Sequence, residues 1–82
     1  MQETNILWAD DEIDLLKPHI MLLNEKGYFV KTVTNGRDAV EAFKDAYFDL
    51  VFLDENMPGL TGLETLAELK SINPAVPMVL VT

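Results

Sequence analysis

The stretch that decides the fold is Leu50-Val51-Phe52-Leu53-Asp54, in which four apolar residues are followed by a carboxylate. A short and uniformly apolar run of this kind predicts a strand that is buried on both faces of a parallel sheet. Ile6-Leu7-Trp8-Ala9 has the same character, and it is followed directly by Asp10-Asp11-Glu12. Two predicted buried strands therefore end in acidic residues.

Two more strands complete the predicted sheet. Residues 29–33 (Phe-Val-Lys-Thr-Val) are half polar and rich in β-branched side chains, which is typical of a strand at the edge of a sheet. Residues 77–82 (Pro-Met-Val-Leu-Val-Thr) form another apolar run, with its proline at the start, where a strand tolerates one. The sequence thus predicts four strands, of which residues 29–33 form an edge.

A helix is predicted after each of the first three strands. The apolar positions of the first helix recur every three or four residues, at Ile13, Leu16, Ile20 and Leu23. Gly27 follows and favours the left-handed conformation found at helix ends. Pro18 inside a helix would cost about 3 kcal/mol, so the regular helix is expected to begin within a turn of it.

The second helix is predicted to follow Asn35, which can cap a helix N-terminus. Its apolar stripe consists of Ala39, Val40 and Phe43. Arg37 and Glu41 are one turn apart and are expected to pair on its outer side.

The third helix begins with Thr61-Gly62-Leu63-Glu64, which has the Thr-x-x-Glu form of a capping box. Leu63, Leu66 and Leu69 or Lys70 carry the helical period onward to Asn73-Pro74. Strands and helices thus alternate with short connections, which predicts an α/β fold with a parallel sheet and right-handed crossovers.

The composition limits both the size and the partners of the protein. At 82 residues the chain holds one domain at most. Its formal net charge of -8 disfavours binding to nucleic acid or to anionic membranes. No apolar run reaches the length of a membrane span, and the start of the chain does not resemble a signal peptide. The absence of cysteine excludes disulfides and thiolate metal sites and is consistent with a cytoplasmic location.

Asp10, Asp11 and Asp54 follow predicted strands at the same edge of the sheet. Functional crevices of open parallel sheets lie at the carboxyl ends of the strands, so these carboxylates are expected to converge. Because unpaired carboxylates raise one another's pKa, their convergence indicates a bound cation. Mg²⁺ is the natural candidate, since it prefers hard oxygen ligands. The alternative is that these acids only terminate strands and cap the next helix.

A loop that contains Asn56-Met57-Pro58 and Gly62 follows Asp54. Together with Asp10-Asp11-Glu12 and Asp54, this loop makes the sequence resemble, over all 82 positions, the receiver domains of two-component response regulators. The resemblance implies a flavodoxin-like, doubly wound parallel sheet with strand order 2-1-3-4. Residues 1–82 would then be the N-terminal two-thirds of a single receiver domain.

The resemblance also implies a role for each site residue. Asp54 is the phosphoacceptor, which takes a phosphoryl group from a sensor histidine kinase and relays a conformational signal to a downstream output domain. Mg²⁺ would be bound by Asp11 and Asp54 directly, by Asp10 largely through water, and by the backbone carbonyl of Asn56. Thr82 would contact the phosphoryl group and shift on activation. Such a domain is not an enzyme in the ordinary sense, because it catalyses only its own phosphorylation and dephosphorylation.

The sequence departs from the family pattern at its C-terminal end. A receiver domain continues through a helix, a fifth strand with a lysine beside the phosphate, and a last helix, and residues 1–82 contain none of these. The lysines of the chain fall on predicted helices, a helix end or the edge strand. Phosphorylation of the isolated piece is therefore expected to be impaired. Its strand Met78 to Val81 is expected to be an open edge through which copies associate or exchange strands.

Three other functions fit part of the sequence. A nucleotide hydrolase can hold Mg²⁺ on a strand like residues 50–55, but the sequence has no Gly-x-x-x-x-Gly-Lys-Ser/Thr loop to bind the phosphates. A phosphatase with an Asp-x-Asp pair is disfavoured because Asn56 takes the second position. A receiver-like module that binds partners without phosphorylation remains the main alternative.

Overall fold

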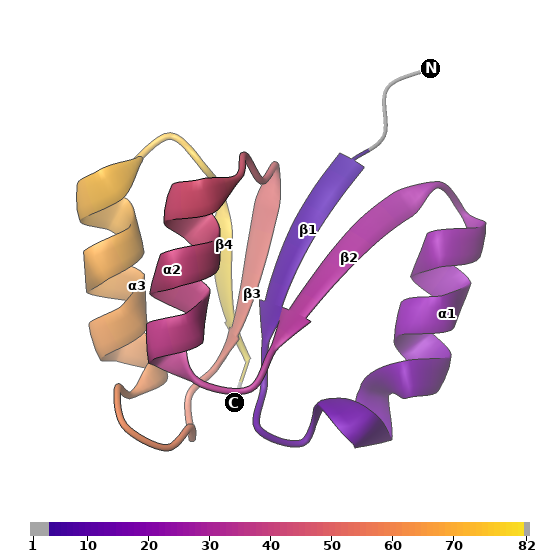
Figure 1. Cartoon of the computed structure of the whole chain (residues 1–82), viewed down its shortest axis with the longest axis horizontal. Coiled ribbons are helices and arrows are strands. Elements are labelled where there is room, and N and C mark those ends of the chain that lie inside the picture. The colour runs from indigo at the N-terminus through magenta and orange to yellow at the C-terminus, as the bar shows by residue number, and fades with distance from the viewer. Residues whose placement is uncertain (1–3, 82) are drawn as a thin grey trace.

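The computed structural model describes residues 4–81 as alternating strands and helices (Figure 1). In chain order the elements are β1 (Thr4–Ala9), the 3-10 helix η1 (Ile13–Leu16), α1 (Lys17–Glu25), β2 (Tyr28–Val33), α2 (Gly36–Asp45), β3 (Leu50–Asp54), α3 (Gly62–Ile72) and β4 (Met78–Val81). Every predicted strand and α-helix is present, and η1 is an addition that the sequence did not indicate. No helix in the described range is long and apolar enough to cross a membrane.

The strands run parallel in one sheet with the order β2-β1-β3-β4. This order confirms the doubly wound, flavodoxin-like fold, and it places β2 at an edge as expected. β1 and β3 are neighbours, with Ala9 opposite Leu53, so the residues that follow these two strands meet at one end of the sheet. β4 reaches the same end, where Val81 lies opposite Asp54.

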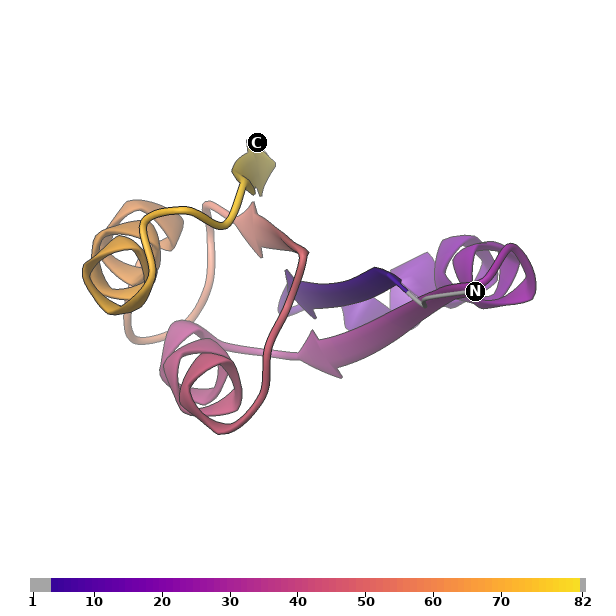
Figure 2. The ribbon, with the colours of Figure 1, turned by 90° about the horizontal axis from the view of Figure 1, so that it is seen from above.

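The hydrophobic core lies between the sheet and the helices α2 and α3, which cover the same face (Figure 2). Successive strand residues point to opposite faces, so every second residue of β1 and β3 enters this core. Leu7, Val51 and Leu53 are fully shielded from solvent, and Ala39 and Phe43 of α2 pack among them. Each large side chain buried here contributes about 1.5–3 kcal/mol to stability.

The opposite face of the sheet is only partly covered. α1 lies on this side next to β2 (Figure 2), and none of its residues is buried. Trp8 of β1 and Phe52 of β3 are half-buried neighbours with ring centroids 4.9 Å apart. The indole Nε1 of Trp8 is shielded but has no hydrogen-bond partner within residues 4–81. The expected burial of β1 and β3 on both faces is therefore correct for the α2 side and only partly met on the Trp8 side.

The helix ends follow the sequence signals. α1 begins with Pro18 in its first turn, and Gly27 after it has a φ of 95°, in the left-handed region. Asn35 caps α2 through its side-chain oxygen. Thr61 and Glu64 form the predicted capping box of α3, in which each side chain accepts a hydrogen bond from the backbone amide of the other residue.

The buried side of α3 differs from the prediction. Leu63 is 57% exposed, whereas Thr65 and Leu69 are fully shielded and Leu66 is half-buried. The hydroxyl of Thr65 donates to the Thr61 carbonyl over 2.8 Å, which satisfies its polar group inside the helix. A buried threonine thus takes the position that the leucine pattern had assigned to Leu63.

The expected Arg37–Glu41 pair is absent. Within residues 4–81 the structure records one ion pair, between Lys17 and Asp14 at 3.2 Å. Arg37 and Glu41 are both exposed on α2, where a pair of this spacing gains only about 0.2–0.5 kcal/mol and must order two flexible side chains.

Candidate metal centre

Three carboxylates meet where β1 and β3 end. Asp10 extends the ladder of β1 by donating its N–H to the Val33 carbonyl over 3.1 Å, and Asp11 follows it. Asp54 is the last residue of β3. Asp10, Asp11 and Asp54 each offer one oxygen, and these oxygens all lie within 4.8 Å of one another. The structure thus brings together the three carboxylates that the sequence predicted to converge.

Backbone amides hold two of these carboxylates in place. Oδ1 of Asp10 accepts a hydrogen bond from the N–H of Glu12 over 2.8 Å, and Oδ1 of Asp54 accepts one from the N–H of Asn56 over 3.2 Å. In each case the donor is two residues ahead, a local turn that aspartate forms readily. The structural alternative is correct in that these acids follow strands, but its helix-capping part is wrong, because no side chain caps η1 or α1; Asp10 instead stabilises the turn before η1. Each carboxylate nevertheless keeps a second oxygen for a ligand.

The charges at this centre repel one another. Burial raises the pKa of Asp10, the charges of Asp54 and Asp11 raise it further, and the hydrogen bond from the Glu12 amide opposes them. Asp10 and Asp54 are half-buried while Asp11 is exposed, so the centre is open to ions from solvent. A divalent cation would offset this repulsion, and a set of hard carboxylate oxygens suits Mg²⁺. The residues therefore fit the metal that the sequence indicated.

The loop after β3 is fastened to the sheet and to α3. The N–H of Glu55 donates to the Val81 carbonyl, and the N–H of Gly62 donates to the Glu55 carbonyl, each over 3.1 Å. Met57 is buried in the core, while Pro58 is exposed. The bond to Val81 was not visible in the sequence, because it joins residues far apart along the chain. They hold the backbone around Asp54 between β4 and the start of α3.

The roles of two predicted site residues, Asn56 and Thr82, are not tested by the structure. Asn56 is exposed and holds Asp54 through its N–H, but the ligand role of its carbonyl stays a prediction. Thr82 lies outside residues 4–81, and its role also stays a prediction. Its neighbour Val81 pairs with Asp54, so β4 leads to the carboxylates.

Known proteins resemble this chain over nearly its whole length. A family model described as the response regulator receiver domain matches residues 6–82. The chain is 38% identical over 78 residues to the transcriptional regulatory protein ZraR of Escherichia coli strain K12, a match that covers 95% of the chain and 18% of ZraR. The chain therefore spans less than a fifth of this relative.

Solved structures share the fold. Chemotaxis response regulator CheY4 of Vibrio cholerae superposes with a TM-score of 0.88 at 30% identity, over 96% of this chain and 68% of CheY4. A chain in the crystal structure of histidine kinase ThkA in complex with response regulator protein TrrA superposes with a TM-score of 0.87 at 35% identity. The match covers 96% of this chain and 68% of that chain. TrrA of Thermotoga maritima in complex with Mg²⁺ and BeF superposes with a TM-score of 0.80 at 28% identity. The match covers 96% of this chain and 87% of TrrA.

Sheet order, carboxylate geometry and family match agree with one another. The parallel order β2-β1-β3-β4 brings Asp10, Asp11 and Asp54 to one edge, and the receiver-domain model matches the segment that contains all of them. The chain belongs to the family of response-regulator receiver domains.

Proposed function

We propose that Asp54 accepts a phosphoryl group from a phosphohistidine of a sensor histidine kinase and that Mg²⁺ assists this transfer. The observation that carries the proposal is the grouping of the Asp10, Asp11 and Asp54 oxygens within 4.8 Å. Asp54 is the member that ends a central strand and is fastened on both sides, to Asn56 through its side chain and to Val81 through the strand pairing.

In the proposed reaction a carboxylate oxygen of Asp54 attacks phosphorus. The P–N bond of the donor breaks while a P–O bond forms, and the imidazole leaves with the electron pair of the broken bond. The product is an acyl phosphate on Asp54. The amide of Asn56 holds Oδ1 of Asp54, so the second oxygen is the one available for attack.

Mg²⁺ would be held by Asp10, Asp11, Asp54 and the backbone carbonyl of Asn56. The bound ion would supply neutralisation of the charge that develops on the phosphoryl oxygens, the main requirement of a loose phosphoryl-transfer transition state. We assign Asp10 a contribution made chiefly through water.

The proposed signal travels through β4. Phosphorylation adds negative charge and acceptor oxygens next to the end of this strand, where Val81 pairs with Asp54 and Thr82 follows in sequence. We assign Thr82 the hydroxyl contact to the phosphoryl group. Met57 and Pro58 lie in the loop that connects Asp54 to α3, and Gly62 is the first residue of α3. We propose that this segment supports the site and that the changed β4 end biases an output domain.

The functions named for the similar proteins support this assignment. ThkA and TrrA are a histidine kinase and a response regulator in one complex, and TrrA was also solved with Mg²⁺ and BeF. ZraR is a transcriptional regulatory protein. By similarity we infer a histidine kinase as donor and a separate output segment as recipient of the signal.

The test is phosphorylation of the full-length protein by acetyl phosphate with Mg²⁺, comparing wild type with Asp54→Asn. Wild type should incorporate phosphate and the variant should not, because an amide cannot form an acyl phosphate. Asp45→Asn is the matched control, since Asp45 is an exposed aspartate at the end of α2 and should leave incorporation unchanged. Phosphate retained by Asp54→Asn would refute the assignment.

A Mg²⁺ titration distinguishes the proposed phosphoacceptor from the alternative, a receiver-like module that binds partners without being phosphorylated. Trp8 lies two residues before Asp10, and its ring contacts Phe52, two residues before Asp54. Its fluorescence should therefore change as Mg²⁺ binds, and Asp11→Asn should abolish the change. No response in wild type would favour the inert module.

A further inference from the structure

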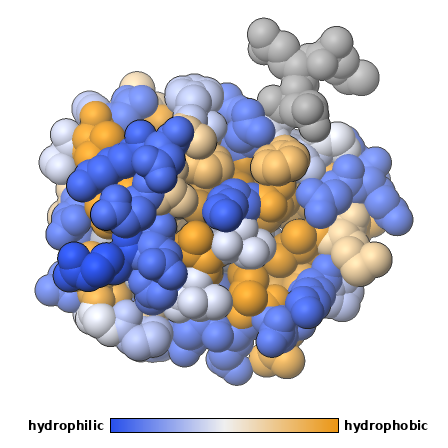
Figure 3. All heavy atoms as spheres, in the orientation of Figure 1, coloured by the Kyte–Doolittle hydropathy of each residue, from blue (hydrophilic) through white to orange (hydrophobic). Residues whose placement is uncertain are grey.

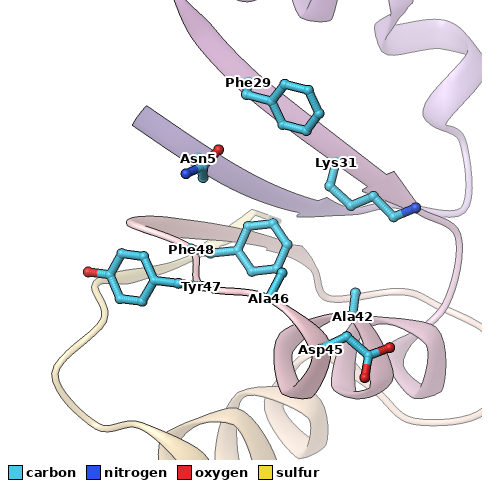
Figure 4. A pocket seen from close by; sticks show the side chains of 8 residues that line it. All are labelled: Asn5, Phe29, Lys31, Ala42, Asp45, Ala46, Tyr47 and Phe48. Atoms are coloured by element: carbon cyan, nitrogen blue, oxygen red, sulfur yellow. The ribbon is translucent and has the colours of Figure 1, made fainter. Parts of the chain in front are cut away.

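The two ends of α2 pack in different ways. Its C-terminal part leaves a hollow of about 540 Å³ beside β2, in which Phe29 and Phe48 face each other and Ala42 and Ala46 lie between them (Figure 4). Figure 3 shows hydrophobic surface in the middle of the same face, between the positions of α2 and α1 in Figure 1. The first residue of α2, Gly36, is buried instead. The helix is therefore packed closely at the end that follows β2 and loosely at the other.

Gly36 is in contact with α3 and with the loop before it. A Cβ at position 36 would collide with Oγ1 of Thr65 and would lie 2.8 Å from Cβ of Leu60. Thr65 is fully shielded from solvent, and its hydroxyl oxygen occupies the space that a side chain at position 36 would fill. The start of α2 therefore rests on the Thr65 hydroxyl only because Gly36 has no side chain.

The same hydroxyl oxygen is held by the first turn of α3. Oγ1 of Thr65 donates to the Thr61 carbonyl over 2.8 Å, a bond that threonine inside a helix can form with the residue four positions earlier. That carbonyl already accepts the N–H of Thr65 over 2.9 Å, so the hydroxyl is not needed to satisfy it. An apolar side chain could fill this space without burying a polar atom, so packing alone does not call for a hydroxyl here.

The first turn of α3 also holds the end of β3. Gly62, the first residue of the helix, donates its N–H to the Glu55 carbonyl over 3.1 Å and packs directly on the backbone of Asp54. Thr61, which carries the carbonyl bound by Thr65, is its neighbour in sequence. A displacement of this turn would therefore move the backbone of Asp54, and with it the carboxylate, relative to the other two acids of the metal centre.

We propose that Thr65 is a positioning residue for phosphorylation of Asp54, an inference that rests on the proposed function and adds a residue to it. The Thr65 hydroxyl, fixed by Thr61 and seated against Gly36, sets the position of the first turn of α3. Through Gly62 this turn sets the position of the Asp54 carboxylate. Thr65 does not touch the reacting atoms. Its effect is nevertheless large, because a misplacement of about 1 Å can slow a reaction about a hundredfold.

The test compares Thr65→Val with Thr65→Ser in the full-length protein, with acetyl phosphate and saturating Mg²⁺. Valine puts a methyl group in place of the hydroxyl, and this group cannot bond to the Thr61 carbonyl and needs more room beside it. The first-order rate constant of phosphorylation should fall about tenfold. Serine keeps the hydroxyl and should react at close to the wild-type rate, although the void left by the lost methyl lowers its stability. If Thr65 only filled space, the rates would follow stability instead.

Leu69→Val is the matched control, because Leu69 is fully buried one turn further along α3. This change should lower the free energy of unfolding in urea and leave the rate constant unchanged. Gly36→Ala presses on the same hydroxyl from α2 and should also slow phosphorylation, which gives a second variant in case Thr65→Val does not fold. Far-ultraviolet circular dichroism checks that each variant is folded.

A wild-type rate constant in Thr65→Val or in Gly36→Ala would overturn the inference. So would a Thr65→Ser variant as slow as Thr65→Val, or a Leu69→Val variant slowed as much as either. Asp54→Asn, measured alongside, separates the two proposals. Phosphate retained by Asp54→Asn would refute the proposed function, whereas its loss there together with wild-type rates in Thr65→Val would refute only the role of Thr65.

Discussion

Gly62 packs so closely against the backbone of Asp54 that a Cβ at position 62 would lie 2.6 Å from the Asp54 carbonyl oxygen. The same Cβ would lie 2.8 Å from Cα of Glu55. Because both neighbours are backbone atoms, they cannot move aside without shifting the end of β3. The start of α3 is therefore held against the residue that we propose as phosphoacceptor only because position 62 has no side chain.

Gly62→Ala should destabilise the protein by about 1–3 kcal/mol, the usual cost of overpacking, and should slow phosphorylation by acetyl phosphate. Urea unfolding measures the first effect and phosphate incorporation the second. Leu63→Ala is the control, since Leu63 is an exposed neighbour in the same helix turn. Unchanged stability in Gly62→Ala would show that the loop adjusts freely.

Asp10 should make the metal-free protein less stable as the pH rises. Burial and neighbouring carboxylates raise its pKa in the folded state, so the folded protein binds this proton more tightly than the unfolded chain. The contribution of Asp10 to stability is then greatest at low pH and is lost as the pH rises through the folded-state pKa.

The difference in unfolding free energy between wild type and Asp10→Asn isolates this contribution. Without metal, Asp10→Asn should be the more stable protein at pH 7, and the difference should vanish in acid. With saturating Mg²⁺ the order should reverse, because the ion requires the charged carboxylate. If Mg²⁺ stabilised Asp10→Asn as much as it stabilises wild type, Asp10 would not be a ligand of the metal.

The capping box of α3 should have the opposite pH dependence. The Thr61 amide lowers the pKa of Glu64, so this stabilisation is present above the ordinary glutamate pKa and is lost as the pH falls through the folded-state value. Glu64→Gln should be less stable than wild type at pH 7 and equal to it in acid. Thr61→Ala should cost about 1 kcal/mol by urea unfolding.

β4 should mediate association of the 82-residue chain. It pairs with β3 on one side only within the described sheet, and Val79 and Val81 are 43% and 37% exposed. Val79→Lys should reduce association in light scattering, since lysine on an edge strand disfavours strand addition. Leu15→Lys is the control, since it removes a still more exposed apolar side chain (71%) away from the edge, and an equal effect of both changes would argue against strand pairing.

Local signals in the sequence identified nearly every element. Runs such as Leu50–Leu53 gave the strands, Asn35 and the Thr61–Glu64 box gave helix starts, and Gly27 gave a helix end. Leu63 was assigned to the wrong side of α3 because helical periodicity cannot tell which of two overlapping stripes meets the sheet. The prediction of an Arg37–Glu41 ion pair was wrong, because spacing alone does not hold two solvated side chains together.

The sequence by itself determined that strands end in Asp10, Asp11 and Asp54, because strand pattern and the carboxylates that follow are local properties of the chain. Tertiary structure decided that their oxygens lie within 4.8 Å, that Gly62 touches the backbone of Asp54, and that a hollow opens beside Phe29. These relationships depend on which strands are neighbours and how far a helix reaches over the sheet. Both are set by packing between segments that are distant along the chain, which no local pattern encodes.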